Sequence, residues 1–244
     1  MRKILFYGTG VVIALIFGIG AYAIVVGPES FGSPAEARFL EMPANPHIIY
    51  LAPQGTSRGL VNEKSMQARG ATSNAQNWQA ARLTASQRPV DALLIEASIL
   101  GNTTPLDEEW LRVQFRDGVA IVGMGVEDDR FARVLGLQTL LAPTEASIPI
   151  GPTGYRLVMS LVLGTPDDVR TLESTDWINQ AIRGEERNII SPSGKINNVM
   201  INSFSKSRGR LDSVQELDTL FLRLTSVIEN AYKLRAEFQQ RIKK

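Results

Sequence analysis

The chain has 244 residues, with 26 lysines and arginines against 25 acidic residues, one histidine and no cysteine. A charge so close to balance argues against a nucleic-acid-binding protein, which needs an excess of cations on some face to neutralise phosphates. The lack of cysteine excludes disulfides, thiolate nucleophiles and cysteine-ligated metals, and a lone histidine, His47, excludes a multi-histidine metal site.

The first predicted element is a transmembrane helix within residues 1–28. Residues 4–28 carry no charge, and about 20 apolar residues suffice to cross the hydrocarbon core as a helix. Arg2 and Lys3 precede this run and the acidic Glu29 follows it, so the positive-inside rule places the N-terminus in the cytoplasm and the rest of the chain outside. We therefore expect a single-pass protein of the cell membrane whose residues 4–28 contact the lipid bilayer.

A cleaved signal peptide is the alternative for this segment. The triplet Ala21–Ala23 fits a small-x-small cleavage site, and cleavage there would give a secreted protein. The apolar run continues through Val26, however, and is longer than the roughly 7–15 residues usual in a cleaved signal. This length favours a retained signal-anchor.

Residues 29–46 are predicted to form a proline-rich linker, and residues 47–210 an α/β domain. Short apolar runs at 47–52, 92–95, 119–126 and 155–163 have the composition of buried strands. Helical patterns lie between them, and this alternation predicts a mostly parallel sheet in a three-layer α/β domain.

The helix predicted after the second of these strands has clear end signals. Thr104 can cap it, Pro105 suits its first turn, and Gly118 follows its end. The spacing of Leu106, Trp110, Val113 and Phe115 approximates an apolar stripe that would face the sheet.

Residues 211–244 are predicted to form a long C-terminal helix. Ser213 and Glu216 match a capping box. Apolar residues recur at spacings of three and four from Val214 to Phe238, so the helix presents one apolar face. That face would cover the chain's own sheet, or would mediate self-association or grip a protein partner.

Three residues are candidates for catalysis, although no complete catalytic set is present. Glu96 and Ser98 follow a predicted strand, at the edge where open α/β sheets form their crevices. Asp128 follows the next strand. Ser98 lacks a G-x-S-x-G context, and His47 would lie at the opposite end of a parallel sheet, too far to serve as its base.

Two further sites are considered and not favoured. Gly123 and Gly125 stand between a strand and a helix, as in nucleotide-binding turns, but Asp128 occupies the position of the third glycine, so we expect no nucleotide cofactor. Glu96, Asp107 and Asp128 could gather around a divalent cation. Acids at helix starts are more often partners of the helix dipole, so no metal is expected.

These patterns support two functional hypotheses. The first is a membrane-anchored extracytoplasmic α/β module that binds or scaffolds without catalysis. The second is an extracytoplasmic carboxylate-dependent hydrolase using Glu96 and Asp128. A deep pocket holding both carboxylates would favour the hydrolase, and a shallow surface would favour the binding module.

Overall fold

The computed structural model describes residues 42–140, 151–164, 178–179 and 201–242. The predicted transmembrane helix of residues 1–28 lies outside these ranges, as does most of the predicted linker. None of the helices within the described ranges combines the length and the apolarity needed to cross a membrane.

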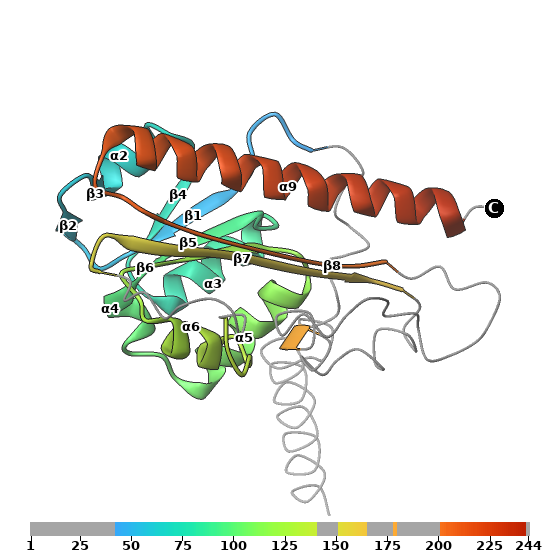
Figure 1. Ribbon diagram of the computed structural model, residues 1–244, viewed down its shortest axis with the longest axis horizontal. Helices are drawn as coiled ribbons and strands as arrows, with labels where there is room; N and C mark the ends of the chain where they lie inside the picture. Colours follow the sequence, from blue (N-terminus) through green and yellow to red (C-terminus); the bar gives the residue numbers. More distant parts are fainter. Residues whose placement is uncertain (1–41, 141–150, 165–177, 180–200, 243–244) are drawn as a thin grey trace, which may run out of the picture. The chain divides into compact units, whose positions relative to one another are not determined.

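A six-stranded mixed sheet forms the centre of the domain, in the order β4-β1-β5-β6-β7-β8. Figure 1 shows it between two layers of helices. The strands are β1 (Ile48–Leu51), β4 (Ser73–Ala75), β5 (Ala92–Glu96), β6 (Ala120–Met124), β7 (Gly154–Leu163) and β8 (Ile201–Arg210). A separate two-stranded hairpin consists of β2 (Ser57–Arg58) and β3 (Val61–Asn62).

The pairing divides this sheet into a parallel half and an antiparallel half. Strands β4, β1, β5 and β6 pair in parallel, which confirms the prediction for this half. Strands β6, β7 and β8 pair antiparallel, so the expectation of a mostly parallel sheet is wrong for the last two strands. The α/β class itself is confirmed.

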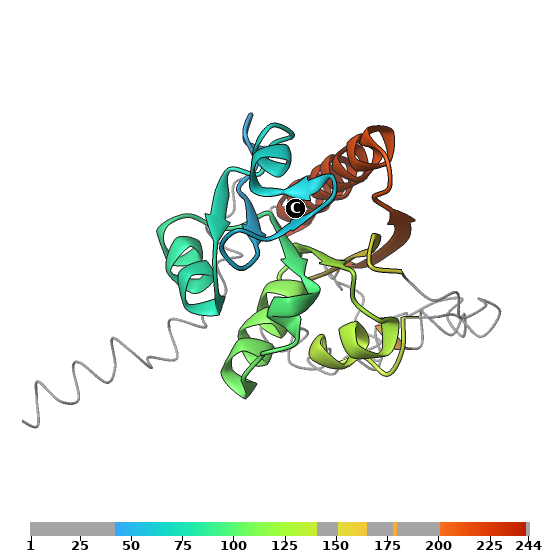
Figure 2. The same ribbon diagram turned by 90° about the vertical axis from the view of Figure 1, so that its left-hand side faces the viewer.

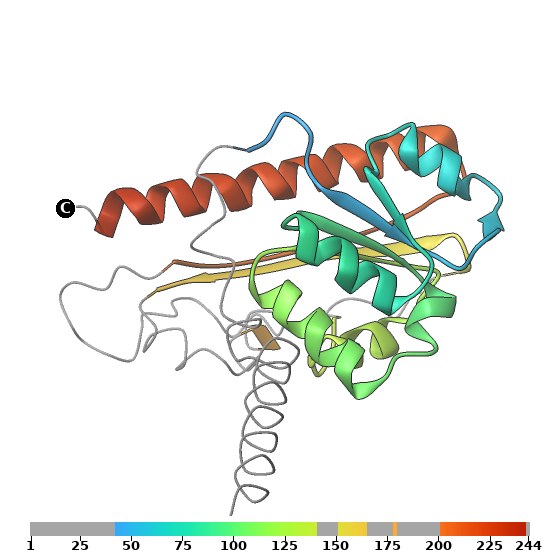
Figure 3. The same ribbon diagram turned by 180° about the vertical axis from the view of Figure 1, so that it is seen from behind.

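Four helices cover one face of the sheet, as seen from behind in Figure 3. They are α3 (Trp78–Gln87), α4 (Ala97–Leu100), α5 (Pro105–Arg116) and α6 (Asp128–Val134). Their core includes Leu111, Phe115 and Phe131 packed against Ile95 and Ile121. We call this face of the sheet the α5 face.

The opposite face carries α2 (Glu63–Gln67) and the long helix α9 (Val214–Ile242), which Figure 2 shows together on one side of the strands. The first half of α9 packs on Tyr50, Leu94 and Val122. Its second half packs on the part of β7 that extends beyond β6, at Met159, Leu161 and Leu163. The predicted apolar face of this helix therefore covers the chain's own sheet. We call this face of the sheet the α9 face.

The helix ends follow the predicted signals. Thr104 and Asp107 form a capping box at the start of α5, and Gly118 after its end has a φ of 81°, which glycine adopts without strain. At α9, the Ser213 hydroxyl accepts from the Glu216 N–H at 3.2 Å, while the Glu216 carboxylate accepts from the Ser213 N–H at 3.0 Å.

One predicted face is rotated from its expected position. On α5, Phe115 is buried as expected, but Leu106 is 57% exposed, and Leu111 and Gln114 are buried instead. Trp110 is only partly buried and makes an edge-to-face contact with Trp78 of α3, with ring centroids 6.2 Å apart. The helix therefore contacts α3 through Trp110 as well as packing on the sheet.

Candidate functional site

The carboxyl ends of the parallel strands hold the first catalytic candidate, Glu96. This last residue of β5 is completely buried, and its Oε1 accepts a hydrogen bond from the Tyr50 hydroxyl at 3.0 Å. Tyr50 belongs to the core of the α9 face, and Leu94, two residues before Glu96, does too. Because side chains alternate along a strand, Glu96 lies on the α9 face.

Asp128, the second candidate, is held by an arginine that the sequence did not single out. The Arg156 guanidinium donates from Nε and Nη2 to the two carboxylate oxygens of Asp128, and both side chains are buried. Arg156 stands on β7 between Tyr155 and Leu157, which both point to the α9 face. Arg156 and the first turn of α6 are therefore on the α5 face.

The structure consequently places Glu96 and Asp128 on opposite faces of the sheet. Each carboxylate has its own partner, Tyr50 for one and Arg156 for the other. A carboxylate-dependent hydrolase requires two carboxylates in one crevice. Glu96 and Asp128 do not share a crevice in this arrangement.

Ser98, the third candidate, lies on the single turn α4 directly after β5. Its hydroxyl is buried and makes no hydrogen bond within the described residues, while its carbonyl accepts from the Asn102 amide at 3.1 Å. His47 precedes β1, and β1 pairs in parallel with β5. His47 and Ser98 are thus at opposite ends of the sheet, as predicted, and they form no nucleophile–base pair.

Asp107 lies at the start of α5, where its side chain takes part in the capping box and forms an ion pair. Its carboxylate accepts from the Thr104 N–H at 3.0 Å and from the Thr104 hydroxyl at 2.7 Å, and it pairs with Arg82 of α3. Burial raises the pKa of Asp107, but the bonds from Thr104 and the Arg82 guanidinium outweigh it, so the pKa lies below its usual value. Among the described residues, no three histidine or acidic side chains gather as metal ligands would.

The two glycines after β6 have structural roles. A Cβ at Gly123 would lie 3.0 Å from the Phe131 ring, so glycine lets α6 pack closely on the strand. Gly125 adopts a φ of 66° in the turn. The turn leads to Asp128, which is paired with Arg156, and this leaves an acidic helix start in place of a phosphate cradle.

His47 belongs to a buried network at the amino end of the parallel strands. Its backbone N–H donates to Asp91 Oδ2 at 2.7 Å, and Tyr232 of α9 donates to Asp91 Oδ1 at 2.8 Å. Its Nδ1 lies 3.1 Å from the carbonyl oxygens of both Arg88 and Pro89. Since carbonyls only accept, Nδ1 carries the proton in these contacts.

The network links separate elements of the fold by hydrogen bonds. The other ring nitrogen, Nε2, lies 3.1 Å from the Ser73 hydroxyl, so both ring nitrogens of His47 have partners. Together, Asp91 and Tyr232 connect the start of β5 to α9. Sequence reasoning placed His47 at the border of the linker and did not identify these partners.

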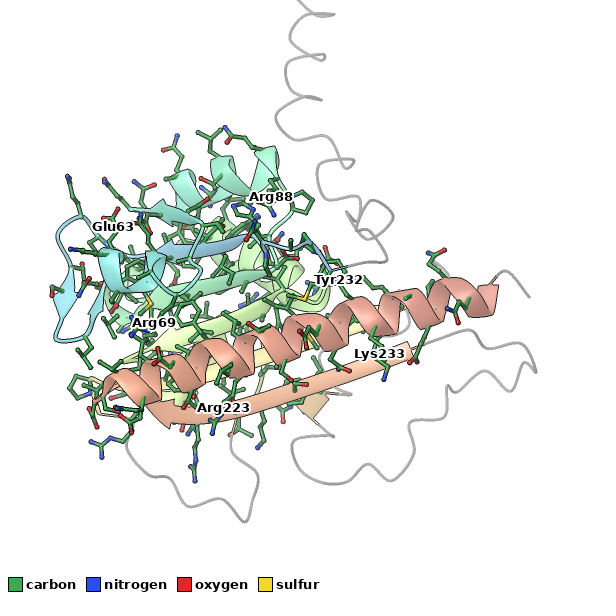
Figure 4. All side chains as sticks on the ribbon, turned by 90° about the horizontal axis from the view of Figure 1, so that it is seen from above. Glu63, Arg69, Arg88, Arg223, Tyr232 and Lys233 are labelled. Carbon is green, nitrogen blue, oxygen red and sulfur yellow. The ribbon has the colours of Figure 1, made fainter. Side chains whose placement is uncertain are left out.

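A cavity of about 250 Å³ between β8 and α9 was also not foreseen. Figure 4 shows Arg223 on the side of α9 that faces β8, and Tyr232 on the opposite side of the helix. The residues that line the cavity are Leu157, Ser205, Lys206, Ser207, Arg223, Ser226 and Val227. They include no carboxylate.

The cavity exists because β8 presents small residues to α9. Ser205, Ser207 and Gly209 alternate along the strand, and Gly209 pairs with Tyr155 of β7. A Cβ at Gly209 would lie 2.6 Å from the Tyr155 ring, and the Arg223 guanidinium donates to the Tyr155 hydroxyl at 3.1 Å. Burial raises the pKa of Tyr155, and the charge of Arg223 offsets part of this effect.

Known proteins offer no further guide to this site. No family model, no curated protein and no solved structure matches the chain.

Proposed function

We propose that the protein is a membrane-anchored, extracytoplasmic α/β module that binds or scaffolds other molecules without catalysis. Residues 4–28 would form a single transmembrane helix with the N-terminus in the cytoplasm, since the run is uncharged and Arg2 and Lys3 precede it. The linker of residues 29–46 would hold the mixed α/β domain away from the bilayer.

The separation of Glu96 and Asp128 is the observation that carries the non-catalytic part of this proposal. They are on opposite faces of the sheet, and each is bound to a buried structural partner, Tyr50 or Arg156. The described cavity lies beside neither of them and is lined by serines, an arginine, a lysine and two aliphatic residues. These features favour a binding surface over hydrolysis by paired carboxylates.

Membrane topology can be tested with single cysteines, because the natural chain has none. A cysteine at Ser86, which is exposed on α3, should react in intact cells with a maleimide that cannot cross membranes. A cysteine added directly after Met1 is the matched control and should react only after the cells are permeabilised. Protection of Ser86→Cys in intact cells, or recovery of the intact chain from cytosol, would contradict the proposal.

The mass of the mature chain separates anchoring from secretion. The full-length mass in the membrane fraction is expected. A mature chain that begins near Ala23 and is recovered in solution would instead establish the secreted form.

Catalysis is tested by offering ester, amide, glycoside and phosphate substrates to the purified chain and to its Glu96→Gln and Asp128→Asn variants. No turnover above the buffer rate is expected from any of the three proteins. Turnover that survives in a fold-preserving control, Asp129→Asn, and disappears in Glu96→Gln or Asp128→Asn would favour the hydrolase.

A further inference from the structure

Strand β8 is the last strand of the described sheet, and among the described strands it has a neighbour on one side only. In the order of the described strands, β8 pairs with β7 alone. Just past β8, the Leu211 N–H donates to the Thr153 carbonyl at 2.8 Å. In an antiparallel pair every second residue bonds to the same neighbouring strand, so the odd-numbered residues of β8 bond to β7. By that alternation the even-numbered residues of β8 direct their N–H and C=O groups away from β7.

A contact from α9 supports this assignment. Arg223 Nη1 donates to the Arg208 carbonyl at 2.9 Å, so the carbonyl of this even-numbered residue is reached from outside the β7–β8 ladder. A carbonyl has two lone pairs, and it can therefore accept a second bond in the plane of the sheet.

The same even-numbered residues place a row of cations beside the edge. Phe204 packs with Phe115 on the α5 face. Lys206, Arg208 and Arg210 follow it at every second position, and all three are exposed. The Lys206 ammonium also donates to the Leu140 carbonyl at 3.2 Å. Arg210 pairs at the surface with Asp212 at 2.8 Å, an exposed contact of low strength. The edge is therefore positive on its α5 face.

The α9 face of the edge has a different character. Ser205 and Ser207 point toward α9 and line the cavity of about 250 Å³ together with Leu157, Lys206, Arg223, Ser226 and Val227. The Ser207 hydroxyl is buried and makes no hydrogen bond within the described residues. This side suits small side chains that are polar or aliphatic.

We propose that β8 binds an extended acidic segment of a partner protein as an added strand. The backbone of the segment would pair with the outward groups of β8, as in other cases of strand addition. Its acidic residues, at every second position, would face Lys206, Arg208 and Arg210, and the small residues between them would lie over the cavity. This inference rests on the proposed function only in taking the domain to be a binding module.

A second copy of the chain fits this edge poorly. Two β8 strands paired with each other would bring their own lysines and arginines together, and like charges opposite each other destabilise a sheet. Charged edges also discourage unspecific pairing. An acidic strand converts the same charges from repulsive to attractive, and this complementarity is why the proposal names an acidic partner.

The test uses the full chain in a neutral detergent and a fluorescent ten-residue peptide that alternates glutamate with serine and valine. Saturable binding is expected, with slower amide exchange at the even-numbered residues of β8. The variant Lys206→Glu/Arg208→Glu should bind at least about tenfold more weakly, since attractive pairs become repulsive. The control Lys64→Glu reverses an exposed charge on α2 and should leave binding unchanged.

Two altered peptides show whether strand pairing and charge are both needed. A peptide with lysine for glutamate should not bind. A peptide methylated at alternate backbone nitrogens keeps its charges but loses ladder donors, and it should also fail to bind.

Three results would overturn the proposal. The first is that the methylated peptide binds as well as the unmodified one, and the second is that the lysine peptide binds. The third is that Lys206 and Arg208 capture vesicles containing phosphatidylserine while no peptide binds. Cysteine labelling decides the topology separately, so failure of the peptide leaves the anchored-module proposal standing.

Discussion

Arg156 of β7 and Asp128 of α6 form a buried ion pair that joins the antiparallel half of the sheet to a helix following the parallel half. The pair couples two segments that are 28 residues apart in the chain. Burying either charge alone would cost free energy, so the two charges are buried together as an ion pair.

Replacement of Arg156 by methionine should therefore strongly destabilise the protein. The variant leaves the Asp128 carboxylate without its partner, and we expect a loss of about 3–5 kcal/mol in the free energy of unfolding, measured by urea denaturation of the chain in detergent. The double variant Arg156→Met/Asp128→Leu should recover much of this loss. A matched control is Arg130→Met, at an exposed position of α6, the helix that carries Asp128. A similar loss in that variant would argue against the ion pair as the cause.

Asp107 should make the protein less stable in acid. Its folded pKa lies below the usual value, so its contribution is complete above the unfolded pKa of about 3.9 and is lost as the pH falls through the lower folded value. Replacement by asparagine should flatten the dependence of unfolding free energy on pH in that window. Glu109→Gln, at an exposed position on α5, is the control, and an unchanged slope in Asp107→Asn would refute this assignment.

Tyr232→Phe should weaken the attachment of α9 to the sheet. The substitution removes the hydroxyl that donates to buried Asp91 at 2.8 Å, and a buried acceptor that loses a donor costs about 1–3 kcal/mol. Thermal or urea unfolding measures the loss. Lys233→Met changes an exposed neighbour on the same helix and should have little effect; equal stability of Tyr232→Phe and wild type would show that the bond is dispensable.

Gly209→Ala should perturb the β7–β8 pair through Tyr155. The added Cβ would stand 2.6 Å from the Tyr155 ring, and such overpacking typically costs about 1–3 kcal/mol. At Gly151 a Cβ would meet nothing within 4 Å, so Gly151→Ala is a matched control. Combining Gly209→Ala with Tyr155→Leu, which shortens the clashing side chain, should restore part of the stability; no recovery would assign the defect to the strand backbone.

The sequence was a good guide to the parallel half of the sheet and to α9. Strands β5 and β6 are continuous apolar runs because both of their faces are covered, and such runs are recognisable without partners. The capping residues Thr104 and Ser213 act within a few residues of their own position, so local sequence suffices to predict them. The amphipathic period of α9 is similarly local.

Strands β4 and β8 could not be predicted in the same way. β4 has three residues, Ser73–Ala75, and β8 consists mainly of serine, lysine, arginine and asparagine. Their extended form depends on pairing with β1 and β7, which is a tertiary effect that outweighs local propensity. The alternation of serine and glycine with larger residues in β8 was the available signal for a strand whose one side faces α9.

The candidate site was predicted in position but not in geometry. Glu96 ends one parallel strand and Asp128 follows the neighbouring one, as the order of elements suggested. The Glu96 side chain lies on the α9 face with Tyr50, whereas the antiparallel return of β7 brings Arg156 to Asp128 on the α5 face. That pairing joins residues far apart in the chain and leaves no mark in either local pattern.

The position of α9 in the chain has a consequence for biosynthesis. This helix follows every strand that it covers, and its residues Leu217, Leu224 and Ile228 complete the apolar core over β1, β5 and β6. Because a chain emerges from the ribosome N-terminal end first, at about 5–20 residues per second, the part of those strands that α9 covers remains exposed until the helix itself has been synthesised. The α9 face is therefore the part of the apolar core that is completed last during synthesis.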